Sequence, residues 1–370
     1  MQPDADPVST GEAWIAEGRA REAASLLQTY VDANRAGLLL RLSLQKALIA
    51  CGDTRAALAL ARETALTNPD AAPAALGLGE ALLGSEHLPA AIAEFQRALR
   101  LDPGLEAARI GLGSAWLAAG EPEKALAAWR EVEQSASPVL ADRIAEAENV
   151  RRQPRCDPRY VRHLFDQFAA DYDARMLGQL HYQAPAILRQ LADFLGLAEE
   201  KAYSVLDLGC GTGLMGVAVH DRALRLDGVD LSPAMIGKAR QRGIYDELAI
   251  CDIGVWLAES GRLYDLILAA DTLVYIGDLA PLFASAARRL VSGGHFLFTV
   301  ERKDSEGFEL GPKRRWRHSA AYLRAEANRA GCEVAAVLDC ELRTEAGAPV
   351  PGLAVALAKR ACAFSCASQT

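Results

Sequence analysis

The first half of this chain repeats itself every 34 residues, and a repeat narrows the possible folds more than any other property of the sequence. An alanine recurs at this interval at four positions, Ala23, Ala57, Ala91 and Ala125. A second column is glycine in three of four copies, and a third is apolar throughout; they are Gly18, Gly52, Glu86 and Gly120, and Leu27, Ala61, Phe95 and Trp129. A period of this length predicts helical units that bury their apolar faces only against one another.

The best copy covers residues 72–105, and it resembles the tetratricopeptide repeat at nearly every signature position. The matching positions are Leu78, Gly79, Leu82, Ala91, Phe95, Ala98 and Pro103. The resemblance implies a helix, a turn and a second helix in each of about four copies. Small residues at Gly79 and Ala91 would let two helices approach closely. Phe95 or Trp129 would fill the space between neighbouring helical pairs.

The repeats are predicted to end at residues 151–158, where two prolines and clustered arginines interrupt the helical pattern. We therefore expect an all-α tetratricopeptide-repeat solenoid over residues 1–153 and a second domain over residues 154–370. Two roles are open for the solenoid. It stabilises the protein or joins two copies into a homodimer, or its concave face binds a peptide or a partner protein.

Composition excludes several classes of function. Acidic side chains outnumber basic ones by 48 to 40, so no overall basic field attracts nucleic acid as a partner. The first ten residues do not resemble a secretory signal, and no apolar stretch approaches the ~18 residues that would span a membrane. The eight cysteines lack the spacing of a zinc site, which favours reduced thiols in a cytoplasmic protein.

The second half alternates short apolar runs with amphipathic stretches, which predicts a parallel sheet with helices on both faces. The run 203–208 is followed by a loop, Gly-Cys-Gly-Thr-Gly, and by a helix from Leu214. Such a loop lies at the carboxyl edge of the sheet, where ligands bind. Dinucleotide-binding folds share this pattern, but a carboxylate at Asp207 would repel a pyrophosphate. It suits a ligand with an ammonium group and a sulfonium, which points to S-adenosylmethionine.

Three further strand ends carry residues suited to the same ligand. Asp230 ends the second predicted strand and can accept hydrogen bonds from both ribose hydroxyls. Asp252 ends the third and can accept from the adenine amino group, while Leu231 and Ile253 pack against the adenine faces. The fourth strand, residues 264–271, is expected to pass beneath the transferable methyl group.

With these motifs, residues from about 160 to 360 resemble a class I S-adenosylmethionine-dependent methyltransferase, and the whole chain resembles bacterial tetratricopeptide-repeat methyltransferases. The resemblance implies an α/β, Rossmann-like domain with a mostly parallel sheet of seven strands. It carries cofactor-binding roles onto Asp207, Gly209, Gly211, Gly213, Asp230, Asp252, Met235 and Ala269. An open α/β domain that binds another ligand, or none, is the alternative.

An aromatic pattern precedes the predicted sheet. Phe165, Phe168, Tyr172 and Met176 would share one helix face, at spacings of three, four and four residues. Such a face belongs to the core, or it resembles the N-terminal cap helix of small-molecule methyltransferases. In the second interpretation the helix closes over the cofactor and places Tyr172 near the cofactor carboxylate.

Four residues are candidates for a general base or for contact with the methyl acceptor. His318 is the first choice because histidine titrates near neutrality, although a solvated loop or a helix-capping neighbour would also explain it. His181, Glu301 and Tyr275 are the others. No Asn-Pro-Pro-Tyr follows the fourth strand, so the pattern of amino-directed nucleic-acid and glutamine methylation is absent. The acidic cluster of metal-dependent catechol-type enzymes is also absent, so no metal is predicted.

These observations predict a cytoplasmic methyltransferase whose repeat domain recruits or presents the acceptor, which is a protein, a peptide or a carrier-bound small molecule. The alternative is a small-molecule O- or N-methyltransferase whose repeats serve dimerisation. A third hypothesis is a scaffold whose methyltransferase domain is inactive, and the intact glycine loop argues against it.

Overall fold

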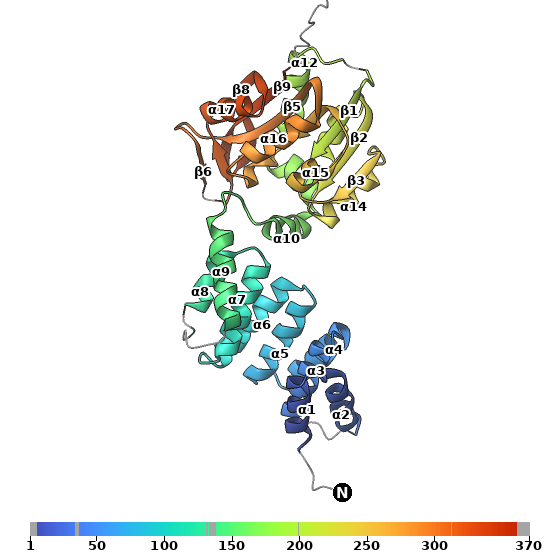
Figure 1. The fold of residues 1–370 in the computed structure, drawn as a ribbon, viewed down its shortest axis with the longest axis vertical. Coiled ribbons are helices and arrows are strands. Elements are labelled where there is room, and N and C mark those ends of the chain that lie inside the picture. Colours follow the sequence, from blue (N-terminus) through green and yellow to red (C-terminus); the bar gives the residue numbers. More distant parts are fainter. Residues whose placement is uncertain are drawn as a thin grey trace, which may run out of the picture. The chain divides into compact units, whose positions relative to one another are not determined.

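The chain forms two compact units, Met1–Arg152 and Gln153–Thr370. The computed structural model describes residues 6–33, 37–130, 132, 138–198, 200–311 and 313–360. Within these residues the first unit consists of helices and turns, and the second is built around a β-sheet (Figure 1). No helix in the described part of the chain is long and apolar enough to cross a membrane.

The first unit is a succession of short helices that keeps the period of the sequence. They are α1 (Pro7–Ala16), α2 (Ala20–Asp32), α3 (Leu38–Ala50), α4 (Thr54–Thr67), α5 (Ala72–Gly84), α6 (Leu88–Leu101), α7 (Glu106–Ala118), α8 (Pro122–Trp129) and α9 (Pro138–Arg152). Helices α3, α5 and α7 begin 34 residues apart, as do α4, α6 and α8. Prolines in the first turn of α5, α6 and α8 suit positions whose N–H groups have no partner within the helix.

The glycine column of the repeat lies in the turns between paired helices. Gly18, Gly52 and Gly120 have φ angles of 79°, 82° and 72°, in the left-handed region that glycine adopts without steric cost. Glu86, the exception in this column, has the same handedness at a φ of 58°. The column is therefore explained by backbone conformation.

Small residues also allow close packing between helices of the first unit. A Cβ added at Gly111 would lie 2.4 Å from the Phe95 ring, and one added at Gly79 would lie 2.8 Å from it. At Gly113 the added atom would be 2.2 Å from Trp129 Nε1. The large rings of Phe95 and Trp129 thus occupy space that glycine leaves open.

The sheet of the second unit is mixed. Its strands are β1 (Tyr203–Leu208), β2 (Ala223–Asp230), β3 (Glu247–Ile250), β4 (Tyr264–Ala269), β5 (Leu290–Arg302), β6 (Phe308–Leu310), β7 (Trp316–His318), β8 (Cys332–Glu345) and β9 (Ala348–Lys359). Strands β3, β2, β1, β4 and β5 are parallel neighbours in that order. Strand β9 pairs antiparallel with β5 and with β8.

The described part of the sheet has nine strands, where the sequence predicted seven. The two additional strands, β6 and β7, pair with each other, and β7 also pairs with the end of β5. The segment that ends in His318 is not a solvated loop. Residues Trp316–His318 form β7, where Trp316 and His318 pack beside Phe308 of β6.

Helices cover both faces of this sheet. They are α12 (Ala184–Phe194), α13 (Leu214–Val219), α14 (Pro233–Gln241), α15 (Ile253–Glu259), α16 (Ala280–Arg289) and α17 (Ala320–Arg329). One core contains Leu257, Phe283 and Leu323 from α15, α16 and α17. A separate core contains Leu188 of α12 and Val219 of α13. The carboxyl ends of the parallel strands remain at one edge between these layers.

The aromatic segment before the sheet is not one continuous helix, contrary to the prediction. Helix α10 (Pro158–Phe168) ends early, and a short helix, α11 (Tyr172–Ala174), runs into a π-helical turn, η1 (Arg175–Gln179). The rings of Phe165 and Tyr172 still meet edge to face, 6.0 Å apart. Met176 packs in a cluster with Tyr182, and Tyr172 packs against the same cluster.

Candidate functional site

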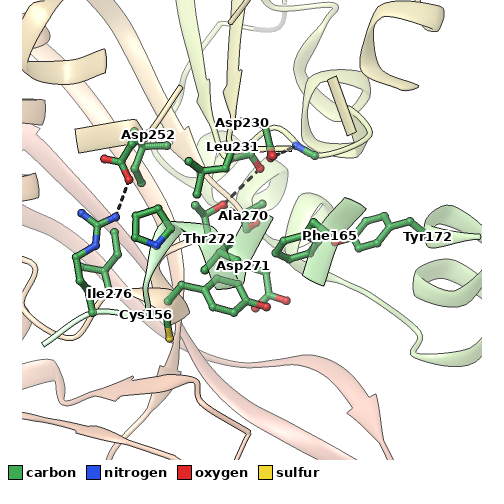
Figure 2. Close-up of a pocket in the computed structure, with 17 residues that line it drawn as sticks. Cys156, Phe165, Tyr172, Asp230, Leu231, Asp252, Ala270, Asp271, Thr272 and Ile276 are labelled. Carbon is green, nitrogen blue, oxygen red and sulfur yellow. Dashed lines mark hydrogen bonds and ion pairs between the residues drawn. The ribbon is translucent and has the colours of Figure 1, made fainter. Parts of the chain in front are cut away.

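A pocket lies at the carboxyl edge of the sheet (Figure 2). Its walls come from the strap Arg155–Cys156, from α10, from the loops after β1, β2, β3 and β4, and from Tyr172. Among the predicted cofactor residues, those that line it are Tyr172, Gly209, Gly211, Asp230, Leu231, Asp252 and Ile253. Most of the remaining lining is apolar or aromatic, as in pockets that bind small molecules.

The glycine loop brings the backbone close to this pocket. Gly209, Gly211 and Gly213 have φ angles of 67°, 55° and 90°, so each occupies the left-handed region. A Cβ at Gly209 would lie 2.4 Å from the Thr272 side chain. Gly213 precedes the first turn of α13 and does not line the pocket. The loop therefore needs glycine for conformation at three positions and for space at the first.

Asp230 is held rigidly beside the glycine loop. Its Oδ2 accepts a hydrogen bond from the Gly211 N–H at 2.9 Å, and its Oδ1 accepts one from the Ser232 N–H at 2.8 Å. Burial raises the pKa of Asp230 to about 6, and these two backbone bonds oppose the rise. The carboxylate is thus fixed in orientation and can still accept further hydrogen bonds from a ligand.

Asp252 caps α15 and faces the same pocket. Its Oδ1 accepts hydrogen bonds from the N–H groups of Gly254 and Val255, at 2.9 and 3.3 Å. Its Oδ2 accepts one from the Arg155 guanidinium at 2.6 Å. Leu231 and Ile253 supply apolar surface nearby. A planar group with a hydrogen-bond donor would fit between these two side chains and Asp252.

Asp207, Met235 and Ala269 lie behind the pocket and do not line it. The Tyr245 hydroxyl donates a hydrogen bond of 2.7 Å to Asp207 Oδ2, and Asp207 Oδ1 has no side-chain or backbone partner. Burial raises the pKa of Asp207 to about 7, and the Tyr245 hydroxyl opposes the rise. Asp207 is therefore a buried residue at the end of β1 that hydrogen-bonds to Tyr245 and does not face the pocket.

The segment α10–α11 is fastened across the glycine loop. Asp166 accepts hydrogen bonds from the Ser232 hydroxyl and the Ala234 N–H, at the start of α14. Asp173 accepts one from the Thr212 hydroxyl and one from the Arg242 guanidinium. These bonds position Phe165 and Tyr172 on one side of the pocket, as Figure 2 shows.

Of the four candidates for acceptor chemistry, Tyr275 alone lines the described pocket. Burial raises its pKa to about 12. His318 is fully buried, with Nε2 at 2.9 Å from the Gly277 carbonyl oxygen, and burial lowers its pKa to about 4. Glu301 is buried against Arg343, and His181 is exposed. Neither residue lines the pocket.

Several pocket residues were missed by sequence reasoning because they lie in a segment that resembles a linker. Residues 154–156 form a strap along the loop after β4: the Cys156 N–H donates to the Tyr275 carbonyl at 2.8 Å, and the Gly277 N–H donates to the Pro154 carbonyl at 2.7 Å. Arg155 and Cys156 therefore line the pocket. In the sequence, only Arg155, which lies between Pro154 and Pro158, indicates that this segment could line a pocket.

Asp271 and its partner Arg343 are a further part of the site. Asp271 follows β4 and lines the pocket, and Arg343 lies on β8, 72 residues later. Pairing across such a separation depends on the register of β8 and cannot be read from local patterns. Among the residues that the structure describes, no group of His, Cys, Asp or Glu side chains is placed to hold a metal ion.

Comparison with known proteins agrees with the geometry of the second unit. Residues 176–336 match the family model described as a methyltransferase domain. The malonyl-[acyl-carrier protein] O-methyltransferase of Acetivibrio thermocellus is 28% identical over 146 residues, which cover 39% of this chain and 50% of that protein. Human methyltransferase-like protein 27 is 37% identical over 95 residues, which cover 25% of this chain and 38% of that protein.

Among solved structures, a magnesium protoporphyrin IX methyltransferase from Synechocystis with bound S-adenosylhomocysteine aligns with a TM-score of 0.44. It is 16% identical, and the alignment covers 55% of this chain and all of that one. The chain spans about half the length or less of these two curated relatives. Within the second unit, residues 176–336 are thus similar to a methyltransferase domain.

Proposed function

We propose that this protein transfers a methyl group from S-adenosylmethionine to an acceptor bound in the same pocket. The observation that carries the proposal is the convergence of Asp230, Asp252 and the glycine loop on one pocket. Asp230 would accept hydrogen bonds from the ribose hydroxyls, and Asp252 would accept one from the adenine amino group. Leu231 and Ile253 would pack against the adenine ring. The residues present therefore fit the cofactor.

When bound, the cofactor supplies an electrophilic methyl group on a positively charged sulfur. The chain's own task is to align the acceptor with that methyl group and to exclude water from it. The fastened segment α10–α11 suits this task because it brings Phe165 and Tyr172 over the glycine loop. The predicted role of Tyr172 beside the cofactor carboxylate is part of the proposal.

For the first unit we propose a tetratricopeptide-repeat solenoid, supported by the 34-residue spacing of its helices and by the left-handed turn residues. It would recruit or present a protein, a peptide or a carrier-bound molecule. Dimerisation through the repeats, with a free small molecule as the acceptor of an O- or N-methyltransferase, is the second candidate. Sedimentation of the full chain separates them, since a monomer at high concentration would contradict dimerisation.

We also propose a cytoplasmic location and no nucleic-acid partner, on the grounds of the cysteine pattern and the acidic balance of the sequence. None of the six cysteines among the described residues forms a disulfide. Oxidised cysteines in protein isolated from its native host would contradict the location.

Calorimetric titration of the full chain with S-adenosylmethionine tests the cofactor assignment. We expect binding to the unaltered protein and a loss of about tenfold or more in affinity for Asp230→Ala, because a charge-assisted hydrogen bond contributes about 1.5–3 kcal/mol. Asp221→Ala is the matched control, since it removes the same side chain at an aspartate that pairs with Arg189 and lies outside the pocket. Absence of heat with the unaltered protein would favour the scaffold hypothesis.

A further inference from the structure

One carboxylate in the pocket, that of Asp271, is given no role in the cofactor binding proposed above. Asp271 lies two residues beyond the end of β4, the strand that is expected to pass beneath the transferable methyl group. Its φ of 57° is in the left-handed region, which is uncommon for residues other than glycine. The Asp271 N–H donates to the Thr299 hydroxyl at 2.9 Å, which holds this conformation. Such strain at a pocket commonly accompanies function.

A buried arginine, Arg343, is paired with Asp271. Arg343 Nη1 lies 2.8 and 3.0 Å from the two carboxylate oxygens of Asp271. The other guanidinium nitrogens of Arg343 contact Glu301 and Glu345. Burial raises the pKa of Asp271, and the charge of Arg343 opposes this rise. Each carboxylate oxygen can accept more than one hydrogen bond, so Asp271 can bind a ligand while it remains paired.

Aromatic rings form the wall beside Asp271. Phe165 meets Tyr172 at 6.0 Å and Tyr275 at 5.6 Å between ring centroids, both edge to face. Aromatic faces attract cations, particularly in a site shielded from water. Figure 2 shows Asp271 and Phe165 on one side of the pocket and Asp252 on the other. The aromatic wall therefore lies on the side of the pocket opposite Asp252, the residue proposed to bind the adenine amino group.

The charges that line the described pocket also favour a cation. They are the carboxylates of Asp230, Asp252 and Asp271 and the guanidinium of Arg155. Arg155 is paired with Asp252, and Asp271 is paired with Arg343, which does not line the pocket. An anionic acceptor would approach the methyl group beside Asp271 and be repelled by it. An ammonium group would be attracted by Asp271 and by the aromatic wall.

We propose that the methyl acceptor is an amine, and that Asp271 contacts the acceptor nitrogen within the aromatic wall formed by Phe165, Tyr172 and Tyr275. The inference rests on the proposed methyltransferase function and names the acceptor class for it. Asp271 removes one proton from the ammonium group, which gives the nitrogen a free electron pair. That pair forms the new C–N bond as the C–S bond breaks, and the C–S electron pair remains on sulfur. The proton on Asp271 then passes to water.

The test compares three probes that share one hydrocarbon skeleton and differ in their polar group: 2-phenylethylamine, 3-phenylpropionate and 2-phenylethanol. Binding of each is measured by calorimetry to the full chain saturated with S-adenosylhomocysteine, so that no turnover is needed. We expect the amine to bind roughly tenfold or more tightly than the alcohol, and the carboxylate to bind least. Equal or tighter binding of the carboxylate or the alcohol, or no binding of the amine, would overturn the proposal.

Substitution then assigns the preference to Asp271. In Asp271→Asn the amine should lose about tenfold or more in affinity, while S-adenosylhomocysteine should bind as before. Asp221→Asn, the substitution of a surface aspartate paired with Arg189, should change neither. Unchanged amine binding in Asp271→Asn would contradict the proposed contact between Asp271 and the acceptor nitrogen, even if the unaltered protein prefers the amine. If Asp271→Asn fails to fold, the comparison of the three probes on the unaltered protein decides alone.

The two proposals fail in different ways. A full chain that does not bind S-adenosylhomocysteine contradicts the methyltransferase function. A chain that binds it but does not prefer the amine contradicts only the acceptor class.

Discussion

At the scale of single residues, the turn at Glu86 lacks the glycine that the three equivalent turns contain. The left-handed conformation costs a residue with a Cβ about 1–2 kcal/mol, part of which is offset because glycine loses more entropy on folding. We expect Glu86→Gly to stabilise the first unit by about 0.5–1 kcal/mol, measured as a rise in its melting temperature. The reverse type of change, Gly52→Ala, should lower it, since Gly52 has a φ of 82°. A decrease with Glu86→Gly would contradict this account.

Asp207 gives a residue-scale prediction about pH. Burial raises its pKa from an ordinary value of 3.8 to about 7, so the folded state holds this proton more tightly than the unfolded state. The contribution of Asp207 to the free energy of unfolding is complete below its pKa in the unfolded chain. It is lost as the pH rises through its pKa in the folded chain. Raising the pH from about 5 to about 8 should therefore destabilise the protein, by on the order of 2 kcal/mol from this group.

Urea unfolding at the two pH values measures this effect. In Asp207→Asn the difference between the two pH values should shrink, because asparagine does not titrate. Asp221→Asn should leave the difference unchanged, since the hydrogen bond from Arg189 lowers the pKa of Asp221 below its ordinary value of 3.8 and the group stays ionised throughout the range. An undiminished pH effect in Asp207→Asn would show that other groups cause it.

At the scale of elements, the helices of the first unit approach one another where glycine replaces larger residues. Gly113→Ala would place a Cβ 2.2 Å from Trp129 Nε1, and the ring would have to move. We expect a loss of about 1–3 kcal/mol in the free energy of unfolding, from overpacking. Gly84→Ala is the control, because a Cβ there meets nothing within 4 Å and alanine favours the helix. Equal effects of the two substitutions would contradict the packing argument.

The elements differ in how far the sequence predicts them, for physical reasons. Strands β1 to β4 are short apolar runs bounded by glycine or acidic residues, so their ends and the pocket beside them follow from local patterns. Strands β6 and β7 have three residues each, and they are extended only because they pair with each other. No local sequence pattern predicts that pairing. The π-helical turn after Tyr172 likewise interrupts a periodicity that would suit one helix.

The same distinction applies to the candidate site. Asp230 and Asp252 follow strand ends and line the pocket, whereas Arg343 reaches Asp271 from a distant strand. His318 was singled out for its titration range, yet its place in the fold is set by packing against Tyr322 and a backbone carbonyl. Sequence shows which residues can do chemistry, and tertiary packing decides which of them face the ligand. The cofactor and acceptor roles of these residues stay predictions.

At the scale of the whole molecule, the two units have hydrophobic clusters of their own, so a ligand of the second unit should stabilise that unit alone. S-adenosylmethionine at about 100 times its Kd would add about 2.7 kcal/mol to the stability of the unit that binds it. In differential scanning calorimetry of the full chain we expect two transitions, of which one moves upward with the ligand. Gly113→Ala should move the other one downward. A ligand that shifts both transitions equally would mean that the units unfold as one.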